Sequence, residues 1–366
     1  MSTCTGHRSR VSPVGTALQN GFGAAARLLM LALFALSLAG CFGPGLHSRE
    51  SYVFGTRVEV LVWGQREHEA YAAADAVLRE FDRLHRAFHA WQASPVSEAN
   101  AAIAAGHAID VNEELAGHIV AAQDIARATD HLFDPGIGRL VALWGFHGEE
   151  FASRLPDAAA LAALQAERPS IADLHLDGHV LTSRKRSVAL DFGGYLKGVA
   201  LDRAADILRA HGIDNALINI GGNILALGSK SGTPWRVGIQ HPRRPEPLAT
   251  LALHDGEAIG TSGDYQRFFE YEGRRYCHLI DPRRGEPAQQ TQSLTVLIPP
   301  GRQSGMRSDV LSKPLFVLGD DWPSLARPLD VGFVLRVAAD GRIEATPQMA
   351  ARLTLLGGAR LDALRE

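Results

Sequence analysis

The chain has 366 residues, of which 46% are hydrophobic and 21% are charged, and its formal net charge at pH 7 is −3. This composition is ordinary for a globular protein, and the length is ample for a full core in one large or two intertwined domains. The near-neutral charge gives no support to nucleic-acid binding, so we expect no nucleic-acid partner.

The N-terminus has the features of an export signal. Three arginines precede an apolar run: Arg8, Arg10 and Arg27. The run, residues 28–38, is too short for a membrane span, and small residues follow it. Leu38-Ala39-Gly40-Cys41 resembles the bacterial lipobox, which implies cleavage before Cys41 and lipidation of its thiol. We therefore expect a signal peptide over 1–40 and a lipid-anchored chain in the cell envelope, facing the periplasm. An uncleaved anchor or an ordinary signal peptide is the alternative.

One internal cysteine remains once this signal is removed. Cys4 lies in the removed segment and Cys41 is the lipid site, which leaves Cys277. No disulfide is then possible within the mature chain. We interpret Cys277 as a small strand residue rather than a nucleophile, because nothing places a base on its sulfur.

The first half of the mature chain carries strand and helix patterns. Residues 41–50 are expected to form a tether, followed by a strand over 52–63 in which apolar and polar residues alternate. Apolar residues at three- and four-residue spacing predict an amphipathic helix over 67–88. Further helices are expected near 113–129 and over 156–167. The whole of 51–366 is expected to be one domain.

The segment 191–224 is the most informative of the chain. It is expected to contain a short strand ending at Asp191, a Gly193-Gly194 turn, a helix and a second strand. Lys197 falls in the first turn of that helix, where free N–H groups and the helix dipole favour an anion. Asp191 adds a carboxylate suited to a hydrogen-bonding ligand or to a Mg²⁺ shell. As a local pattern, a plain structural turn fits equally well, because this is neither a Walker A loop nor G-x-G-x-x-G.

The second half is rich in strand patterns. Strands are expected over 235–240, 250–254 and 293–299. A hairpin is expected from 268–271 and 276–280, joined by a Glu272-Gly273 turn, and a further strand region over 332–346 turns at Asp340-Gly341. Together with the helices they predict an α+β fold, with helices packed on mixed, mostly antiparallel sheets.

These motifs, taken together, resemble the ApbE family, the FAD:protein FMN transferases. The run Asp191–Gly198 is similar to the family's D-x-G-G/A-x-x-K-G element. Further matches follow in the family's order: Phe54-Gly55-Thr56, Phe133-Asp134-Pro135, Leu143–Phe146, Arg236–Pro242, Thr261–Tyr265 and His278–Pro282. The resemblance implies an ApbE-like, T-fold-related architecture. It also implies Mg²⁺-dependent transfer of the FMN moiety of FAD to a Ser or Thr hydroxyl of an exported or membrane protein, with release of AMP.

Such a transfer requires groups that bind the pyrophosphate, groups that neutralise its charge, and a base that deprotonates the incoming hydroxyl. Lys197 and the helix N-terminus are placed to hold phosphate. His278 is the best candidate for the base, because imidazole titrates near neutrality and its position before Leu279-Ile280-Asp281-Pro282 matches the family motif. Asp264 and Arg267 could organise the site, although a structural turn explains them equally well.

The resemblance also places contacts to FAD. Three aromatic residues are candidates for stacking on its planar rings: Phe54, Trp91 and Phe133. Four further residues are expected beside them: Leu132, Asp134, Asp191 and Ile280.

The expected metal site departs from the family pattern. By resemblance, the ligands of Mg²⁺ fall at the carbonyl of Gly194 and within Asp309-Val310-Leu311-Ser312-Lys313. Lys313 replaces a threonine that supplies a metal-ligating oxygen, and a protonated lysine has no acceptor atom. Either Asp309, Ser312 and water complete the shell, or the ammonium takes over part of the cation's charge, or transfer is lost. We favour the first two together. A surface lysine displaced by Pro314 is the plain alternative.

Two other functions remain open at this point. With water as the acceptor, the same site would be an FAD pyrophosphatase that gives FMN and AMP. Lys313 also suggests a lipoprotein that binds FAD without catalysis.

Overall fold

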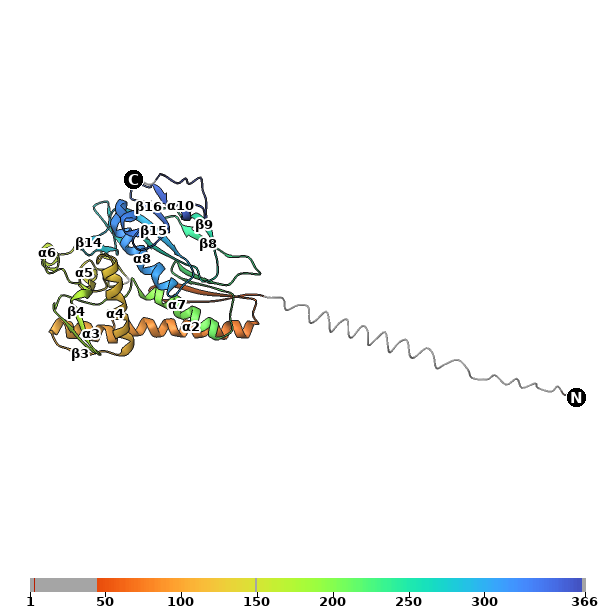
Figure 1. Cartoon of the computed structure of the whole chain (residues 1–366), viewed down its shortest axis with the longest axis horizontal. Helices are drawn as coiled ribbons and strands as arrows, with labels where there is room; N and C mark the ends of the chain where they lie inside the picture. Colours follow the sequence, from red (N-terminus) through yellow and green to blue (C-terminus); the bar gives the residue numbers. More distant parts are fainter. Residues whose placement is uncertain (1–2, 4–44, 149, 364–366) are drawn as a thin grey trace. The chain divides into compact units, whose positions relative to one another are not determined.

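The computed structural model describes residues 3, 45–148 and 150–363, and the chain divides into two units, 1–45 and 46–366 (Figure 1). All the helices and strands named below lie in the second unit. The expected signal peptide and Cys41 lie outside the described residues. Within the described part of the chain, no helix combines the length and the apolar character needed to cross a membrane.

One antiparallel sheet of eight strands forms the centre of the fold, in the order β1-β2-β6-β7-β10-β15-β16-β17. Its strands are β1 (Leu46–Val53), β2 (Thr56–Trp63), β6 (Ala216–Ile220), β7 (Asn223–Leu227), β10 (Ala258–Gly263), β15 (Thr291–Ile298), β16 (Phe333–Ala338) and β17 (Ile343–Ala345). Seven of the eight residues of β15 are buried, because layers cover both faces of the sheet.

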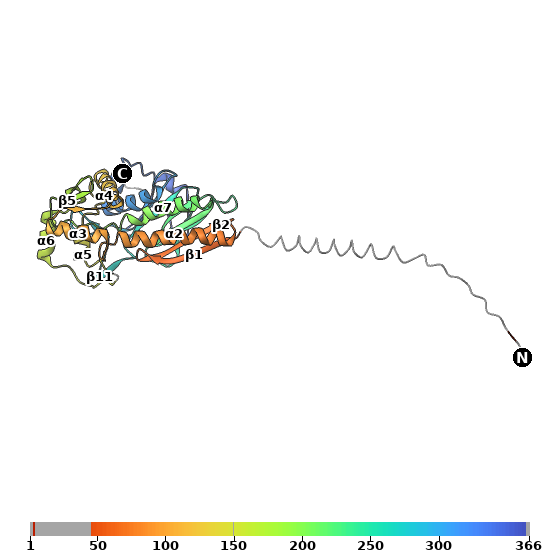
Figure 2. The same ribbon diagram turned by 90° about the horizontal axis from the view of Figure 1, so that it is seen from below.

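Three helices cover one face of this sheet: α2 (Glu67–Ala87), α7 (Leu196–Ala210) and α8 (Ser304–Leu318). Figure 2 shows α2 running along β1 and β2, and α7 contacts β6 and β7. Helix α8 packs on β10 and β15 and also directly on α7. The buried sides of these helices form the main core with the sheet, through residues such as Phe81, Leu208 and Phe316.

A smaller sheet covers the opposite face. Its order is β18-β9-β8, with β8 (Trp235–Gln240), β9 (Pro247–Leu253) and β18 (Leu353–Leu355), and α10 (Pro347–Ala350) lies beside it. Strand β8 alternates buried and exposed residues along its length, so one side faces this second core. Trp235, Leu297 and Met349 pack together there.

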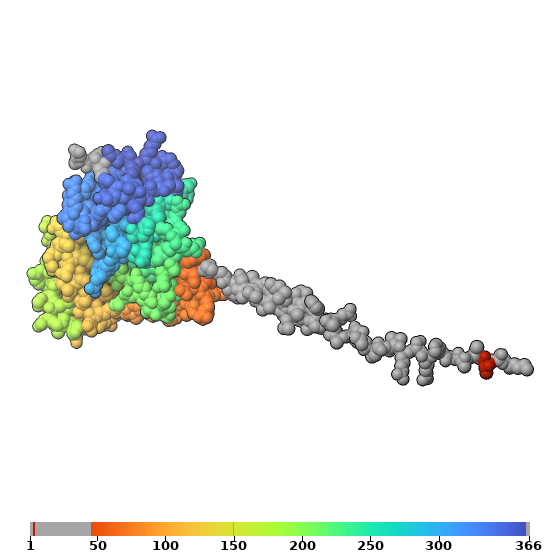
Figure 3. Space-filling model, turned by 45° about the vertical axis from the view of Figure 1, so that its right-hand side comes forward, coloured from red at the N-terminus to blue at the C-terminus, as the bar shows by residue number. Residues whose placement is uncertain are grey.

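The remaining elements form a layer of short helices and hairpins beside the main sheet. The helices are α3 (Pro95–Ala105), α4 (Glu113–Ala128), α5 (Gly138–Leu143) and α6 (Ala158–Glu167), with the 3₁₀ turn η1 (Ile171–Asp173). Helix α9 (Trp322–Ala326) and the 3₁₀ turn η2 (Gly319–Asp321) pack on α8 instead. The strands are β3 (Ile109–Asp110), β4 (Leu174–Asp177), β5 (Val180–Ser183), β11 (Phe268–Tyr271), β12 (Arg274–Cys277), β13 (Ile280–Asp281) and β14 (Glu286–Pro287). In the space-filling view of Figure 3, the blue surface of the C-terminal segments rests against the yellow surface of this layer.

The α+β expectation is confirmed, whereas several local predictions are wrong. Residues 46–50 belong to β1 rather than to a tether, and the strand expected over 52–63 is a hairpin. Its turn is made by Phe54 and Gly55, whose φ angles of 57° and 68° are the positive values that a tight two-residue turn needs. Strand β1, LHSRESYV, is mostly polar and has no apolar alternation of its own, so the hydrophobic pattern does not reveal a separate strand before the turn.

Three further local features differ from the predictions. The strand expected to end at Asp191 is absent, and Ala189 makes only an isolated parallel bridge to Ile137. Helix α3 was not predicted, although Ser94 forms a capping box with Ser97 and Pro95 opens the first turn. A strand was also expected over 276–280, but β12 ends at Cys277 and leaves His278 between two short hairpins.

Candidate active site

Helix α7 begins at the glycine turn, as the sequence predicts. The carboxylate of Asp191 accepts the N–H of Gly193 at 2.8 Å, and the N–H of Leu196 returns to the carbonyl of Phe192 at 2.9 Å. Lys197 therefore lies in the first turn of the helix. Gly198 is needed at the next position because a Cβ there would lie 2.6 Å from the carbonyl oxygen of Gly305 on α8.

The anion that lies at this helix N-terminus in the structure is a side chain of the protein. The N–H of Gly198 donates to Oδ2 of Asp309 at 2.9 Å, and the amide of Asn223 donates to Oδ1 at the same distance. Asp309 is completely buried on α8. Burial alone would raise its pKa, but the charges of Lys313 and Lys197 and these hydrogen bonds outweigh burial and hold the pKa below its usual value.

Lys313 completes this cluster. Its Nζ donates to Oδ1 of Asp309 at 2.6 Å and to the carbonyl oxygen of Asp309 at 2.8 Å. The lysine side chain is only 14% exposed, so the surface interpretation is wrong. It lies against the glycine turn: a Cβ on Gly194 would be 2.8 Å from Cε of Lys313. The lysine thus brings together Gly194 and Asp309, two of the positions expected to hold Mg²⁺.

The oxygens of this cluster do not fit a Mg²⁺ shell as they are arranged. Mg²⁺ demands octahedral oxygen ligands at about 2.0–2.1 Å. Oδ1 and the carbonyl of Asp309 instead accept from Lys313, and Oγ of Ser312 bonds to Oγ of Ser262 and to the carbonyl of Asp309, both at 2.8 Å. Among the described residues, no three His, Cys, Asp or Glu side chains form a group that could hold a metal.

Charged side chains surround Lys197. It interacts with Asp309, Lys313, Arg267 and Asp191, while burial is the main cause that lowers its pKa. Burial likewise raises the pKa of Asp191, against the N–H of Gly193 and the positive charges of Arg267 and Lys197. The glycine turn, α7, α8 and the loop between β10 and β11 therefore bring three basic and two acidic side chains together in one partly buried region.

His278 lies within reach of the same charges. Its Nδ1 contacts the carbonyl oxygen of Arg267 at 3.2 Å, and a carbonyl can only accept, so Nδ1 carries the proton and Nε2 the lone pair. Burial and the charges of Arg267, Lys197 and Lys313 lower the pKa of His278 to about 3. The imidazole is therefore neutral at physiological pH, with Nε2 available to accept a proton.

The structure separates the two residues of the GDYQR segment. Asp264 is engaged in an ion pair with Arg243 at 2.6 Å. Arg267 donates to the carbonyl of Phe146 at 2.7 Å, and its buried Nε has no partner within the described part of the chain. Arg267 therefore belongs to the charged region, whereas Asp264 pairs with Arg243 and stabilises the loop that carries that arginine.

The three predicted aromatic residues fall into two places. Phe133 is buried beside the glycine turn, 3.9 Å from the position of a Cβ on Gly194. Phe54 and Trp91 lie near the C-terminal end of α2, where the ring of Phe54 is 5.7 Å from that of His85. Burial lowers the pKa of His89, and the negative charge of Asp191 opposes this shift. This end of α2 therefore lies near the glycine turn.

His85, His89 and His147 were not predicted for the site. The rings of His85 and His89 lie 5.1 Å apart, and His147 lies 5.7 Å from Trp91. Nδ1 of His89 accepts the N–H of Trp91 at 3.1 Å, which fixes the loop that carries this tryptophan. The four-residue spacing of His85 and His89 at the end of a helical pattern was the available signal.

The remaining predicted contacts are buried. Asp134 accepts the N–H groups of Gly136 and Ile171, both at 2.8 Å, so its carboxylate joins two loops of the protein. Leu132 is buried, and Ile280 packs in a small core cluster with Trp144. Cys277 is buried too, and burial raises the pKa of its thiol to about 12, as expected for a structural residue.

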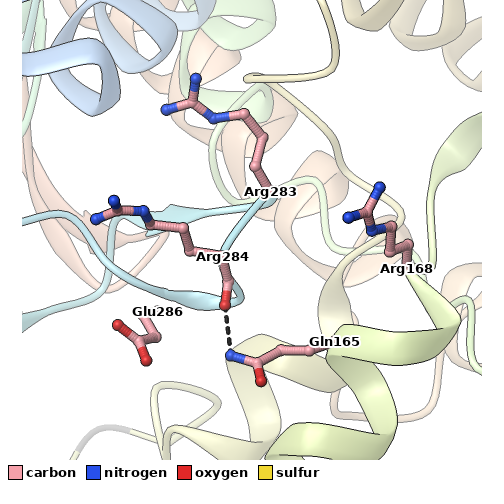
Figure 4. Close-up of a pocket in the computed structure, with 5 residues that line it drawn as sticks. All are labelled: Gln165, Arg168, Arg283, Arg284 and Glu286. Carbon is pink, nitrogen blue, oxygen red and sulfur yellow. Dashed lines mark hydrogen bonds between the residues drawn. The ribbon is translucent and has the colours of Figure 1, made fainter.

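A surface hollow of about 370 Å³ lies next to the hairpin that follows Ile280 (Figure 4). Its lining residues are Gln165, Arg168, Arg283, Arg284 and Glu286. The amide of Gln165 donates to the carbonyl of Arg284 at 2.6 Å, and Arg283 pairs with Asp281 at 2.8 Å. None of these lining residues was predicted for the site.

Comparisons with known proteins place the chain in a family and a fold. The model of the ApbE family matches residues 54–334. The FAD:protein FMN transferase of Rhodobacter capsulatus is 39% identical over 312 residues, which are 85% of this chain and 59% of that protein, less than two thirds of its length. The enzyme of the same name from Treponema pallidum (strain Nichols) is 29% identical over 85% of this chain and 89% of its own. The crystal structure of the ApbE protein from Thermotoga maritima superposes with a TM-score of 0.76 at 30% identity, covering 84% of this chain and 99% of that one.

Proposed function

Since this chain belongs to the ApbE family, we propose that it transfers the FMN moiety of FAD to a protein and releases AMP. The observation that carries the proposal is the charged region at the start of α7. There Lys197 and Arg267 lie near a neutral His278 whose Nε2 lone pair is available. This combination suits a dianionic pyrophosphate and an acceptor that must lose a proton.

In the proposed reaction, a Ser or Thr hydroxyl of an exported or membrane protein attacks the phosphorus on the FMN side. The new P–O bond joins FMN to the acceptor, the bridging P–O bond breaks, and AMP leaves with the bridging oxygen. Lys197 and Arg267 offset the charge that the phosphates carry, which is the main catalytic requirement in phosphoryl transfer. The proton of the hydroxyl goes to Nε2 of His278.

A pKa of about 3 makes His278 a weak base in the free protein. The bound pyrophosphate changes this, because nearby negative charge favours the protonated imidazole and raises its pKa. In the proposed reaction, bound FAD therefore makes His278 a stronger base than it is in the free protein.

Mg²⁺ was expected from the resemblance, but no step of the proposed reaction uses it. The oxygens of Asp309 and Ser312 are held by Lys313, Asn223, Gly198 and Ser262, as described above. These contacts leave the expected donor set engaged within the protein.

We further propose that the mature chain is anchored through lipid on Cys41 and acts in the cell envelope, facing the periplasm. The basic residues, the short apolar run and Leu38-Ala39-Gly40-Cys41 support this proposal. An acceptor in the same compartment would then be reached without crossing a membrane.

The test of the activity uses the purified protein, FAD and candidate exported acceptor proteins, followed by intact mass and AMP measurement. The expected result is an acceptor heavier by one FMN residue, together with one AMP per transfer. Free FMN with AMP, and no change in acceptor mass, would identify a pyrophosphatase instead. FAD that binds and stays intact in every condition would refute the transferase proposal.

A further inference from the structure

Lys313 occupies the place where the resemblance predicts a metal. Its Nζ lies 2.6 Å from Oδ1 of Asp309 and 2.8 Å from the carbonyl oxygen of the same residue. Its Cε lies 2.8 Å from the position of a Cβ on Gly194, so the glycine turn closes over the lysine stem. The ammonium of Lys313 therefore lies between the glycine turn and α8, the two elements that are expected to share a metal cation.

The ammonium has a free bonding capacity that a ligand can use. A lysine ammonium has three N–H donors, and Lys313 uses two of them on Asp309. Asp309 does not need the lysine for its hydrogen bonds alone, since Gly198 and Asn223 already donate to both of its carboxylate oxygens. What the lysine adds to this carboxylate is charge.

The charges near the start of α7 show why that addition matters. Three basic side chains, those of Lys197, Lys313 and Arg267, lie near two acidic ones, Asp191 and Asp309, so basic groups outnumber acidic groups by one where the pyrophosphate is proposed to bind. With a neutral residue at position 313, the cations and carboxylates would balance and leave nothing to offset the phosphates.

We propose that the ammonium of Lys313 is the resident cation of this site and stands in for a divalent metal. The inference rests on the proposed FMN transfer. It predicts that this chain binds no metal between Gly194 and Asp309 and transfers FMN without one. A divalent cation could enter only if Lys313 left Asp309, because two cations would otherwise meet at one carboxylate in a buried place.

The experiment compares the wild-type protein with Lys313→Thr, both loaded with FAD. Mn²⁺ is titrated into each and counted by electron paramagnetic resonance, and FMN transfer is measured in EDTA and in Mg²⁺. Wild type is expected to bind no Mn²⁺ at this site and to transfer FMN within about twofold of the same rate in both conditions. Lys313→Thr is expected to bind one Mn²⁺ and to lose roughly a hundredfold or more in EDTA, with recovery in Mg²⁺.

Two further variants act as controls. Lys313→Met removes the ammonium without offering an oxygen, so it should be inactive in both conditions and should bind no Mn²⁺. If the threonine variant does not fold, the methionine variant still tests whether transfer needs the ammonium. Lys230→Thr removes a lysine that lies over the ring of Trp63, and it should behave like wild type.

The failures of the two proposals are distinguishable. Wild-type transfer that requires Mg²⁺, or Mn²⁺ binding by wild type that Asp309→Asn abolishes, overturns the resident-cation inference and leaves the transferase intact. Absence of transfer by wild type in both conditions refutes the proposed function and the catalytic part of the inference. The Mn²⁺ titration then still decides whether Lys313 excludes the metal.

Discussion

Replacing Gly198 by alanine should force α7 away from α8 and destabilise the protein. The new Cβ would lie 2.6 Å from the carbonyl oxygen of Gly305, 2.6 Å from Cα of Met306 and 2.7 Å from Cβ of Asp309. Carbon atoms pack at about 3.5–4.0 Å, so the helices must separate by about 1 Å at this point. Two of the three contacts are backbone atoms, which cannot turn aside as a flexible side chain would.

The magnitude follows from two opposing effects. Overpacking against backbone costs about 3 kcal/mol, at the upper end of the usual range. Alanine gains about 1 kcal/mol over glycine within a helix, so the free energy of unfolding should fall by about 2 kcal/mol. The shift should also lengthen the bond from Gly198 N–H to Asp309 and weaken FAD binding.

Gly117 offers a matched control. It also lies within a helix, α4, but a Cβ there would meet no heavy atom within 4 Å. Gly117→Ala should therefore raise the free energy of unfolding by up to about 1 kcal/mol. Urea unfolding followed by circular dichroism measures both variants. A Gly198→Ala protein as stable as wild type would refute the close approach of α7 and α8.

Four other predictions concern the ligand, the base, the pH dependence of stability and the anchor. Lys197→Ala should weaken FAD binding roughly ten- to a hundredfold with the fold unchanged, because a charge-assisted contact is lost; an unchanged affinity in a titration contradicts the phosphate role. His278→Gln should lower FMN transfer roughly a hundredfold and affect FAD affinity little, whereas equal losses would make His278 a ligand contact. Because the folded pKa of His278 is about 3, wild type should lose stability as pH falls from about 6.5 towards 3, and the glutamine variant should lose less in pH-dependent urea unfolding. Cys41→Ser should release the protein from the membrane fraction, and a variant that stays there at precursor length refutes the lipid anchor.

Local patterns in the sequence predicted much of the fold. Helix α2 was expected over 67–88 and spans Glu67–Ala87, while β8 and β11 match their predicted ranges. Helix α2 is long and β8 alternates strictly, so their own residues determine them. The hairpin of β1 and β2 was missed because β1 is mostly polar and carries no apolar alternation that would mark it as a separate strand.

By itself, the sequence determined the start of α7, the position of Lys197 in its first turn and the departure from the family pattern at Lys313. Each of these follows from residues close together in the chain. Only the tertiary structure decided what the departure means, because Asp309 and Lys313 reach Gly198 and Gly194 across more than a hundred residues. Hydrogen bonds and charge pairing between α7 and α8 depend on how the two helices pack, and helix packing is set by the shared core and not by either segment alone.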